Sequence, residues 1–499
     1  MGSTSNNTRD WLRGMELLQT RDITFSYDEE KVILQSLDFS LSQGEIVILG
    51  GPTGSGKSTL AKILAGYIPH RIEGQLTGIV YVNGENSQEL TIPQISKRVS
   101  LVQQDVESQL CTLRVADEVA FGPENFREDE EEIIERVNQS LDSVGILHLK
   151  NRSTVALSGG EKQRLAVASI LSIQPNYLIL DEPSSSLDPQ GVTKLKQTLV
   201  DLKQNGLGLL IIEHQVKPFL PIADRTLKLD NKKITSIELS SSTQIQRKSH
   251  ANYPPSKAPL FRCNDLSFSY DNSKVISNLS VEFHRDEVVA LMGNNGSGKT
   301  TFISLLAGIL EPTGGDILLS GIPINKTPRN DIVQNLAMVF QNPNHQIFER
   351  TVWDEQNIIL DVLGTLENGQ SESKQLLSDA NLYSMRERNP FSLSYGQKRR
   401  LNVTSTTVHE PRILLLDEPF IGQDKSGREF ILERINDIKK GGLAIVITHD
   451  SQFAVNHCDR LVFMDQGTIL LDGPPAQTLD RLASLGFPEY SDIGGVVDD

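Results

Sequence analysis

Short apolar runs of buried-strand length alternate along the chain with stretches of helical character. Two of these runs, Glu45–Leu49 and Glu287–Leu291, lead directly into glycine-rich segments. Uninterrupted apolar runs are typical of strands that are covered on both faces. Further strands are expected at Tyr177–Leu180, Leu209–Ile212, Ile413–Leu416 and Ala444–Ile447, and helices at Ser58–Leu64 and Thr300–Leu306. The alternation predicts the α/β class, with a mostly parallel core sheet and flanking helices.

The chain contains an internal duplication. The segment Gly51–Thr59 reads GPTGSGKST and recurs as Gly293–Thr301, which reads GNNGSGKTT. Three further elements recur in the same order at a nearly constant separation: Ile23–Asp28 as Leu266–Asp271, Leu180–Pro183 as Leu416–Pro419, and His214 as His449. Equal order at equal spacing indicates tandem domains. We expect a first domain at 1–239, a Ser- and Pro-containing linker at 240–259, a second domain at 260–482 and a tail at 483–499.

The composition is that of a globular, acidic protein. The 499 residues include 48 Lys and Arg against 64 Asp and Glu, a formal net charge of −16. This balance argues against nonspecific binding of phosphate backbones, so no nucleic-acid partner is expected. No apolar run reaches the roughly 18 residues that span a bilayer, and no apolar signal stretch is found at the N-terminus. Any role at a membrane is therefore expected to depend on a partner.

The glycine-rich segments have the pattern Gly-x-x-x-x-Gly-Lys-Ser/Thr between a strand and a helix, which is typical of a phosphate-binding P-loop. Glycines let backbone N–H groups close around phosphate oxygens, and the helix N-terminus adds positive potential. Each lysine is predicted to hold the β- and γ-phosphates of ATP, and the following hydroxyl a Mg²⁺ ion. The predicted ATP-binding residues are Gly51, Gly54, Gly56, Lys57, Ser58 and Thr59 in the first copy, and Gly293, Gly296, Gly298, Lys299, Thr300 and Thr301 in the second.

An apolar strand ends in two adjacent carboxylates in each copy, Asp181-Glu182 and Asp417-Glu418. The aspartates are predicted to join the Mg²⁺ shell together with the hydroxyls that follow the P-loop lysines. The glutamates are predicted to orient and deprotonate the attacking water. An acidic pair at a strand end is common in isolation, but after a P-loop it indicates a hydrolase of nucleoside triphosphates.

A third motif narrows the class further. Leu157–Arg164 reads LSGGEKQR and lies shortly before the first carboxylate strand. It resembles the signature motif of ATP-binding cassette (ABC) ATPases, and the resemblance covers nearly the whole chain. It implies two tandem ABC ATPase domains, each with an antiparallel β subdomain and a helical signature subdomain. It also implies that Ser158 and Gly160 contact ATP.

The second signature segment, Leu393–Gln397, departs from this motif. It supplies Ser394 and Gly396, for which the resemblance implies the same ATP contacts, but it has Tyr395 where the first copy has Gly159. A helix N-terminus does not require Gly at this position, so function is expected to survive.

The resemblance implies roles for three further pairs of residues. Tyr27 and Tyr270 match the aromatic residue that stacks on adenine. Gln104 and Gln341 match the Q-loop glutamine, which contacts Mg²⁺ and reports to a transport partner. His214 and His449 match the switch histidine at the γ-phosphate.

In ABC ATPases a signature serine is too far from its own P-loop to reach the ATP there, and two domains stack head-to-tail with ATP between them. The resemblance therefore implies an intramolecular pseudo-dimer, in which Lys57 pairs with Ser394 and Lys299 with Ser158. The linker raises the effective concentration of one domain for the other. Neither copy lacks a catalytic element, so two active sites are expected.

Two segments around the Q-loops suggest a subfamily. Arg114–Asn125 and Val339–Phe348 are similar to sequences of energy-coupling factor (ECF) and cobalt-type transporter ATPases, where this region receives helices of a transmembrane T component. The second copy lacks the Phe-Gly-Pro-Glu-Asn sequence of the first, so its groove is expected to differ. The resemblance implies import of a vitamin, vitamin precursor or metal ion, with the T component and a solute-binding S component as partners at the cytoplasmic face of the membrane.

Two alternatives remain at this point. A translation factor of the ABC-F type also has tandem cassettes, but it usually has a long charged helical linker and basic surfaces. A tandem ATPase of a monosaccharide importer has a similar length, but its second P-loop is usually degraded, whereas Gly293–Thr301 is intact.

Overall fold

The computed structural model describes residues 17–28, 31–52, 54–185, 187–213, 216–237, 259–271 and 273–490. These residues form two compact units, 17–237 and 259–490. Every helix in the described ranges is too short or too polar to span a bilayer.

The first unit contains a six-stranded core sheet and a four-stranded antiparallel sheet. The core order is β10-β9-β3-β8-β7-β6, parallel except for β10, and the second sheet has the order β2-β1-β4-β5. The strands are β1 Leu17–Ser26, β2 Val32–Ser42, β3 Ile46–Gly50, β4 Gln75–Val82, β5 Glu85–Asn86, β6 Val99–Val102, β7 Tyr177–Asp181, β8 Gly208–Ile212, β9 Arg225–Asp230 and β10 Lys233–Ser236. The helices are α1 Lys57–Leu64, α2 Tyr67–His70, α3 Ile92–Ser96, α4 Val115–Asn125, α5 Glu130–Ser143, α6 Gly159–Leu171 and α7 Pro189–Gln204.

The second unit repeats this architecture. Its core order is β16-β17-β18-β13-β19-β20, and its antiparallel sheet has the order β12-β11-β14-β15. The strands are β11 Phe261–Tyr270, β12 Ser273–Phe283, β13 Glu287–Met292, β14 Gly314–Leu319, β15 Ile322–Pro323, β16 Leu336–Val339, β17 Ile413–Asp417, β18 Leu443–Ile447, β19 Arg460–Asp465 and β20 Thr468–Gly473. The helices are α8 Lys299–Leu306, α9 Arg329–Asn335, α10 Val352–Val362, α11 Leu366–Asp379, α12 Tyr395–Thr407, α13 Lys425–Lys439, α14 Ser451–His457 and α15 Pro475–Ser484.

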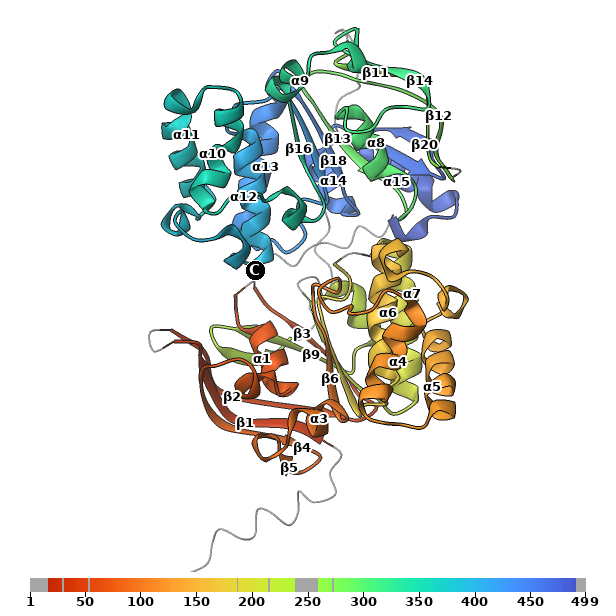
Figure 1. The fold of residues 1–499 in the computed structure, drawn as a ribbon, viewed down its shortest axis with the longest axis vertical. Helices are drawn as coiled ribbons and strands as arrows, with labels where there is room; N and C mark the ends of the chain where they lie inside the picture. The colour runs from red at the N-terminus through yellow and green to blue at the C-terminus, as the bar shows by residue number, and fades with distance from the viewer. Residues whose placement is uncertain are drawn as a thin grey trace, which may run out of the picture. The chain divides into compact units, whose positions relative to one another are not determined.

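Alternate side chains of the central strand enter different cores. On β3, Ile46 and Ile48 pack among the helical subdomain, whereas Val47 and Leu49 pack toward α1 and the antiparallel sheet. Because both faces are covered, the strand is apolar at every position. Within each unit, Figure 1 shows the helices α4–α6 or α10–α12 on the side of the core sheet opposite the antiparallel strands. The predicted fold class is confirmed.

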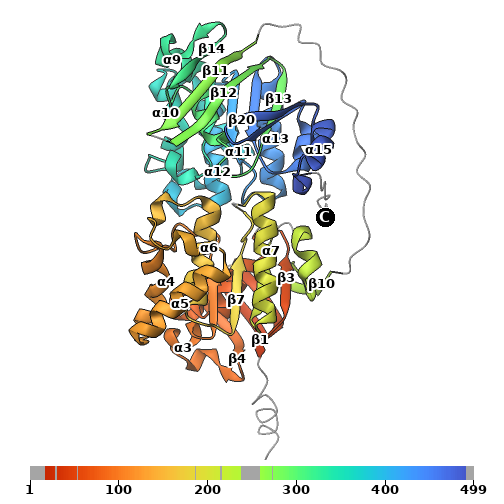
Figure 2. The same cartoon turned by 90° about the vertical axis from the view of Figure 1, so that its right-hand side faces the viewer.

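The end of the described chain packs on the second unit. Helix α15 lies beside β20 (Figure 2), and it continues to Ser484. Beyond it, Phe487 and Tyr490 contact Phe463, with ring centroids 5.0 Å apart in each pair. Tyr490 is fully buried. The packed part of the chain thus includes residues 483–490 of the range 483–499 that the sequence predicts to be a tail.

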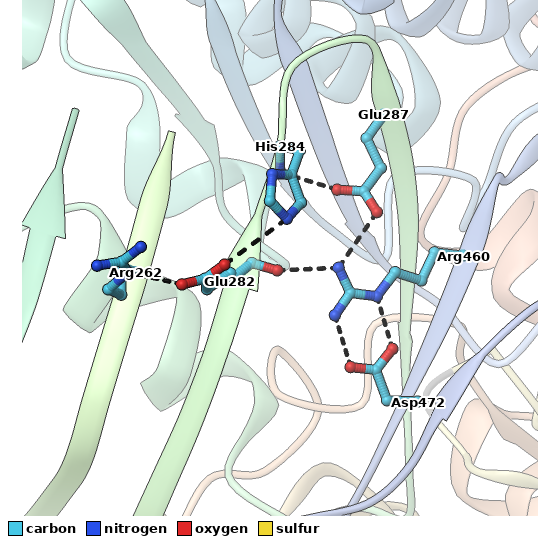
Figure 3. A network of polar contacts seen from close by, with 6 residues as sticks. All are labelled: Arg262, Glu282, His284, Glu287, Arg460 and Asp472. Atoms are coloured by element: carbon cyan, nitrogen blue, oxygen red, sulfur yellow. Dashed lines mark hydrogen bonds and ion pairs between the residues drawn. The ribbon is translucent and has the colours of Figure 1, made fainter. Parts of the chain in front are cut away.

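An arginine joins the central strand, the edge strand and the antiparallel sheet of the second unit (Figure 3). The Arg460 guanidinium donates to both carboxylate oxygens of Asp472 (2.6 and 2.5 Å), to Glu287 Oε1 (3.3 Å) and to the carbonyl of Glu282 (2.9 Å). In the first unit Arg225 contacts Glu45 and the Ser40 carbonyl in the same way. The duplicated contact indicates a structural role.

Replacing Arg460 with Met should destabilise the second unit by about 2–4 kcal/mol, because Glu287, only 1% exposed, would lose its cationic partner. Arg262→Met is the matched control: its pair with Glu282 is exposed and should be worth at most about 1 kcal/mol. Thermal unfolding measured by calorimetry compares the two. Equal losses would contradict the assigned role of Arg460.

Candidate nucleotide-binding sites

Each P-loop follows the central strand of its sheet, at β3–α1 and β13–α8. Gly51 and Gly293 have φ angles of 138° and 146°. A Cβ atom at these positions would lie 2.2 Å from the Leu229 carbonyl oxygen and 2.1 Å from that of Met464. Only glycine allows this close approach of neighbouring backbone. The remaining predicted glycines, Gly54, Gly56, Gly296 and Gly298, also have positive φ angles.

The P-loop lysines lie inside their loops. Lys57 Nζ donates to the carbonyls of Gly51 (2.7 Å) and Pro52 (2.9 Å), and Lys299 Nζ makes equivalent bonds of 2.7 and 2.9 Å to Gly293 and Asn294. Burial lowers the pKa of Lys57, and the nearby carboxyl groups act in the opposite direction. A cation held over a loop of backbone N–H groups is suited to phosphate.

A hydroxyl and a carboxylate meet beside each lysine. Thr300 Oγ1 donates to Asp417 Oδ2 at 2.7 Å, and Ser58 is hydrogen-bonded to Asp181. Asp181 is 7% exposed, and its Oδ1 has no hydrogen-bond partner within the described residues. Burial raises the pKa of Asp181 to about 6. An unsatisfied carboxylate oxygen next to a hydroxyl fits Mg²⁺, which prefers such oxygen ligands and would supply charge neutralisation at the phosphates.

The two predicted catalytic glutamates share an unusual backbone conformation. Glu182 and Glu418 have φ angles of 52° and 48°, in the left-handed region that non-glycine residues seldom adopt. Each is held by a hydrogen bond from its N–H to the last residue of the neighbouring strand, Ile212 (2.9 Å) or Ile447 (3.1 Å). Such strain is characteristic of functional positions.

Different partners contact the two glutamate side chains. Gln104 Nε2 donates to Glu182 Oε2 at 2.5 Å, whereas His449 Nε2 lies 3.3 Å from Glu418 Oε1. Burial, followed by the charge of Asp417, raises the pKa of Glu418 to about 8. Burial also lowers the pKa of His449 well below its usual value, which favours the neutral ring. The predicted switch residue of the first copy, His214, lies outside the described residues.

The raised pKa of Glu418 predicts that the stability difference between the wild type and a Glu418→Gln variant depends on pH. An acid whose pKa is higher in the folded state contributes stability below about pH 4.5, and this contribution is lost as the pH rises through about 8. Glutamine does not ionise, so Glu418→Gln removes this loss of stability at high pH. The Tm of the variant minus that of the wild type should therefore be roughly 3–8 °C larger at pH 9 than at pH 5. Calorimetry without nucleotide measures this, with exposed Glu433→Gln as control. A constant difference would contradict the burial argument.

The rings of the two tyrosines that are predicted to stack on adenine are accessible to solvent. Tyr27 and Tyr270 are 45% and 49% exposed, and each packs edge-on against a phenylalanine, with centroids 4.8 Å apart. The Tyr27 and Thr59 hydroxyls share a hydrogen bond of 3.1 Å. Each ring is therefore accessible to a ligand, and the bond to Thr59 places Tyr27 beside its own P-loop.

Both signature serines start a helix. Ser158 and Ser394 are exposed N-caps of α6 and α12, each with a capping box to the residue three positions on. Gly160 and Gly396 are buried in the first turns, where a Cβ at Gly396 would lie 2.3 Å from the Gly422 carbonyl oxygen. The exposed N-termini could bind an anion contributed by another surface. Each serine is assigned to the opposite P-loop only by prediction.

Sequence reasoning missed a carboxyl group in the first unit. Glu213 is 4% exposed and accepts a hydrogen bond of 2.9 Å from the N–H of Ser184. Ser184 lies two residues after the predicted catalytic Glu182. Burial raises its pKa to about 8. The corresponding residues of the second unit are Thr448 and Phe420, so the two sites differ here. The sequence signal was the Glu-His pair at the end of β8, where the second copy has Thr-His.

The fold and these sites define a P-loop nucleoside triphosphatase. The profile of the ABC transporter family matches residues 34–185 and 276–421, one stretch in each unit. The chain therefore belongs to the ABC transporter family and is an ATPase of the ABC type.

Relatives match along nearly the full length of the chain. An ATP-binding protein of Bacillus subtilis (strain 168), named YkoD for HMP/thiamine import, is 34% identical over 94% of each chain. A Methanosarcina mazei protein described as an ABC transporter ATP-binding protein is 31% identical over 96% of this chain and 92% of its own. A solved structure of ribosome-bound archaeal Pelota and ABCE1 matches 95% of this chain and 84% of its own with a TM-score of 0.67, but at 21% identity it shows the fold alone.

Proposed function

We propose that this ATPase energises solute import as the coupling subunit of an ECF-type transporter. The observation that carries the proposal is the duplication of a complete set of hydrolytic residues in a chain 34% identical to a protein named for HMP/thiamine import. The solute would be a vitamin, a vitamin precursor or a metal ion. The partners would be a T component and an S component, at the cytoplasmic face of the membrane.

The chemistry would use two composite sites of the intramolecular pseudo-dimer. Lys57 and Ser394 would bind one ATP, and Lys299 and Ser158 the other. At each site the lysine and the P-loop N–H groups hold the phosphates, and the hydroxyl–aspartate pair holds Mg²⁺. With Mg²⁺ held beside it, the glutamate would be ionised and would take a proton from the attacking water. Closure on ATP and opening after hydrolysis would move the membrane partner.

A buried glutamate supports a rigid docking segment in the first unit. Glu118 Oε2 accepts hydrogen bonds from the N–H groups of Cys111 (3.0 Å) and Thr112 (2.8 Å). These bonds hold the loop that precedes α4, and the next residue, Leu113, is 73% exposed. An exposed apolar side chain on a fixed loop is suited to contact with another protein.

The second unit repeats this device. Glu355 Oε2 accepts hydrogen bonds from the N–H groups of Phe348 and Glu349, both at 2.8 Å, before α10. Phe348 is 72% exposed. The repetition supports a pair of docking surfaces, around residues 104–125 and 341–360, for helices of the T component.

Purification of the tagged chain from native membranes tests the proposal. The wild type should bring down integral membrane proteins, and Leu113→Glu with Phe348→Glu should lose them. Ile322→Glu, at a 54% exposed position on β15, is the control and should retain them. Co-sedimentation with ribosomes and no membrane companion would instead support the translation-factor alternative. A companion that handles monosaccharides would favour the other importer class.

A further inference from the structure

The second signature helix carries a residue pair that the first lacks. Tyr395, the first residue of α12, turns its hydroxyl back to donate to the carbonyl of Gln341 at 3.0 Å. Arg399, one helical turn further on, has its guanidinium carbon 5.6 Å from the centre of the Tyr395 ring and donates to the Tyr395 hydroxyl at 3.2 Å. The tyrosine is therefore held on the Q-loop by its own hydroxyl and by Arg399.

Arg399 joins three parts of the second unit. Its side chain is fully buried. Nη1 donates to the carbonyls of Phe340 (2.6 Å) and Asp417 (3.1 Å), and Nη2 donates to the carbonyl of Gln341. Phe340 and Gln341 belong to the Q-loop, and Asp417 ends the carboxylate strand. Charge-assisted bonds to buried carbonyls are among the stronger hydrogen bonds in proteins.

Among the described residues of the first unit, Lys162 on α6 contacts Glu107 in the segment after Gln104 at 2.5 Å, but the Tyr395–Arg399 pair has no counterpart. Gly159 and Gln163 occupy the positions of Tyr395 and Arg399. Gln163 is 3% exposed, and its Nε2 has no hydrogen-bond partner within the described residues. The bonds that Tyr395 and Arg399 make to the backbone of the second Q-loop are therefore missing at the matching positions of the first unit.

We propose that Tyr395 and Arg399 are positioning residues that fix the second Q-loop to the second signature helix, so that Gln341 and Ser394 move as one body. The inference rests on the proposed function only in assigning Gln341 and Ser394 to nucleotide sites. Gln341 would serve the site of Lys299, whereas Ser394 would serve that of Lys57. Tyr395 and Arg399 would thus connect the two nucleotide sites through the second unit. The tyrosine that stands at 395, where the first copy has Gly159, is part of this connection.

Hydrogen–deuterium exchange of the full chain without nucleotide tests the connection directly. Arg399→Gln, which introduces the first-unit residue, should speed exchange in a peptide spanning residues 336–346 by at least about tenfold, because three carbonyls lose a charged donor. The equivalent first-unit peptide, 99–109, should not change and serves as the internal control. Tyr395→Phe should give a smaller increase, and Arg399→Lys should restore part of the protection.

Single-site turnover separates positioning from simple stabilisation. With Glu182→Gln only the Lys299 site turns over, and with Glu418→Gln only the Lys57 site does. Arg399→Gln should lower kcat about fivefold or more in both backgrounds, with KM for ATP changed less than twofold. Gln163→Met should leave both unchanged. Unchanged exchange at 336–346, or faster exchange with unchanged kcat in both backgrounds, would overturn the proposal. Neither assay needs a membrane partner, so failure of the transport proposal would be seen separately.

Discussion

Replacing Glu182 and Glu418 together with Gln should lower the rate of ATP hydrolysis by at least about 100-fold, because each site loses the group that activates water. Both glutamates have positive φ angles at the end of a buried strand, beside a Mg²⁺-type hydroxyl–aspartate pair. ATP binding should survive, since lysine and P-loop are intact. Phosphate release at saturating ATP measures the rate, and retention of labelled ATP measures binding.

The control for this experiment is the replacement of two exposed glutamates, Glu131→Gln with Glu433→Gln, on α5 and α13. It removes the same charge without touching either site. Hydrolysis at the wild-type rate in the Glu182/Glu418 variant would contradict the assignment of both residues. Each single variant should retain turnover at the other site.

The second large effect concerns the prediction that the signature serine of each unit serves the nucleotide site of the other unit. With Glu182→Gln in place, the remaining turnover belongs to the Lys299 site, which is predicted to use Ser158. Adding Ser158→Arg should reduce this turnover by at least about tenfold, because the side chain displaces the hydroxyl from the γ-phosphate. Adding Ser394→Arg should leave it nearly unchanged.

The same pair of serine variants in the Glu418→Gln background should give the reverse pattern. This reversal is the internal control, since both substitutions remove an N-cap and cost a similar stability of about 1 kcal/mol. Calorimetry checks that cost. Loss of turnover at the P-loop in the same unit as the replaced serine would contradict the head-to-tail arrangement.

Motifs of short sequence span were predictable because their geometry is local. Gly56 and Gly298 have φ angles of 104° and 98° directly before α1 and α8, a backbone conformation that favours glycine. The run at Ile46–Leu49 was also predictable, although its two cores are formed by distant segments, because burial on both faces makes every position of the strand apolar. The duplication helped further, since a pattern found twice in the same order is improbable by chance.

Contacts between distant segments could not be predicted in this way. Nothing near Arg399 in the sequence indicates that it meets Phe340 and Asp417, because the fold alone brings α12, the Q-loop and β17 together. Tyr395 was a departure from a motif until its hydroxyl was found on the Gln341 carbonyl. The sequence likewise did not indicate that the Glu213 carboxylate accepts a hydrogen bond from the Ser184 N–H.

The sequence by itself determined the fold class, the duplication and the family, because these depend on periodicity and on motifs whose residues are neighbours along the chain. Only the tertiary structure decided how the two halves differ internally: the Tyr395–Arg399 connection in one, and the Glu213–Ser184 contact in the other. The physical reason is that a hydrogen bond depends on distance in space, and residues far apart in the sequence acquire that distance only when the sheet and its helices have packed.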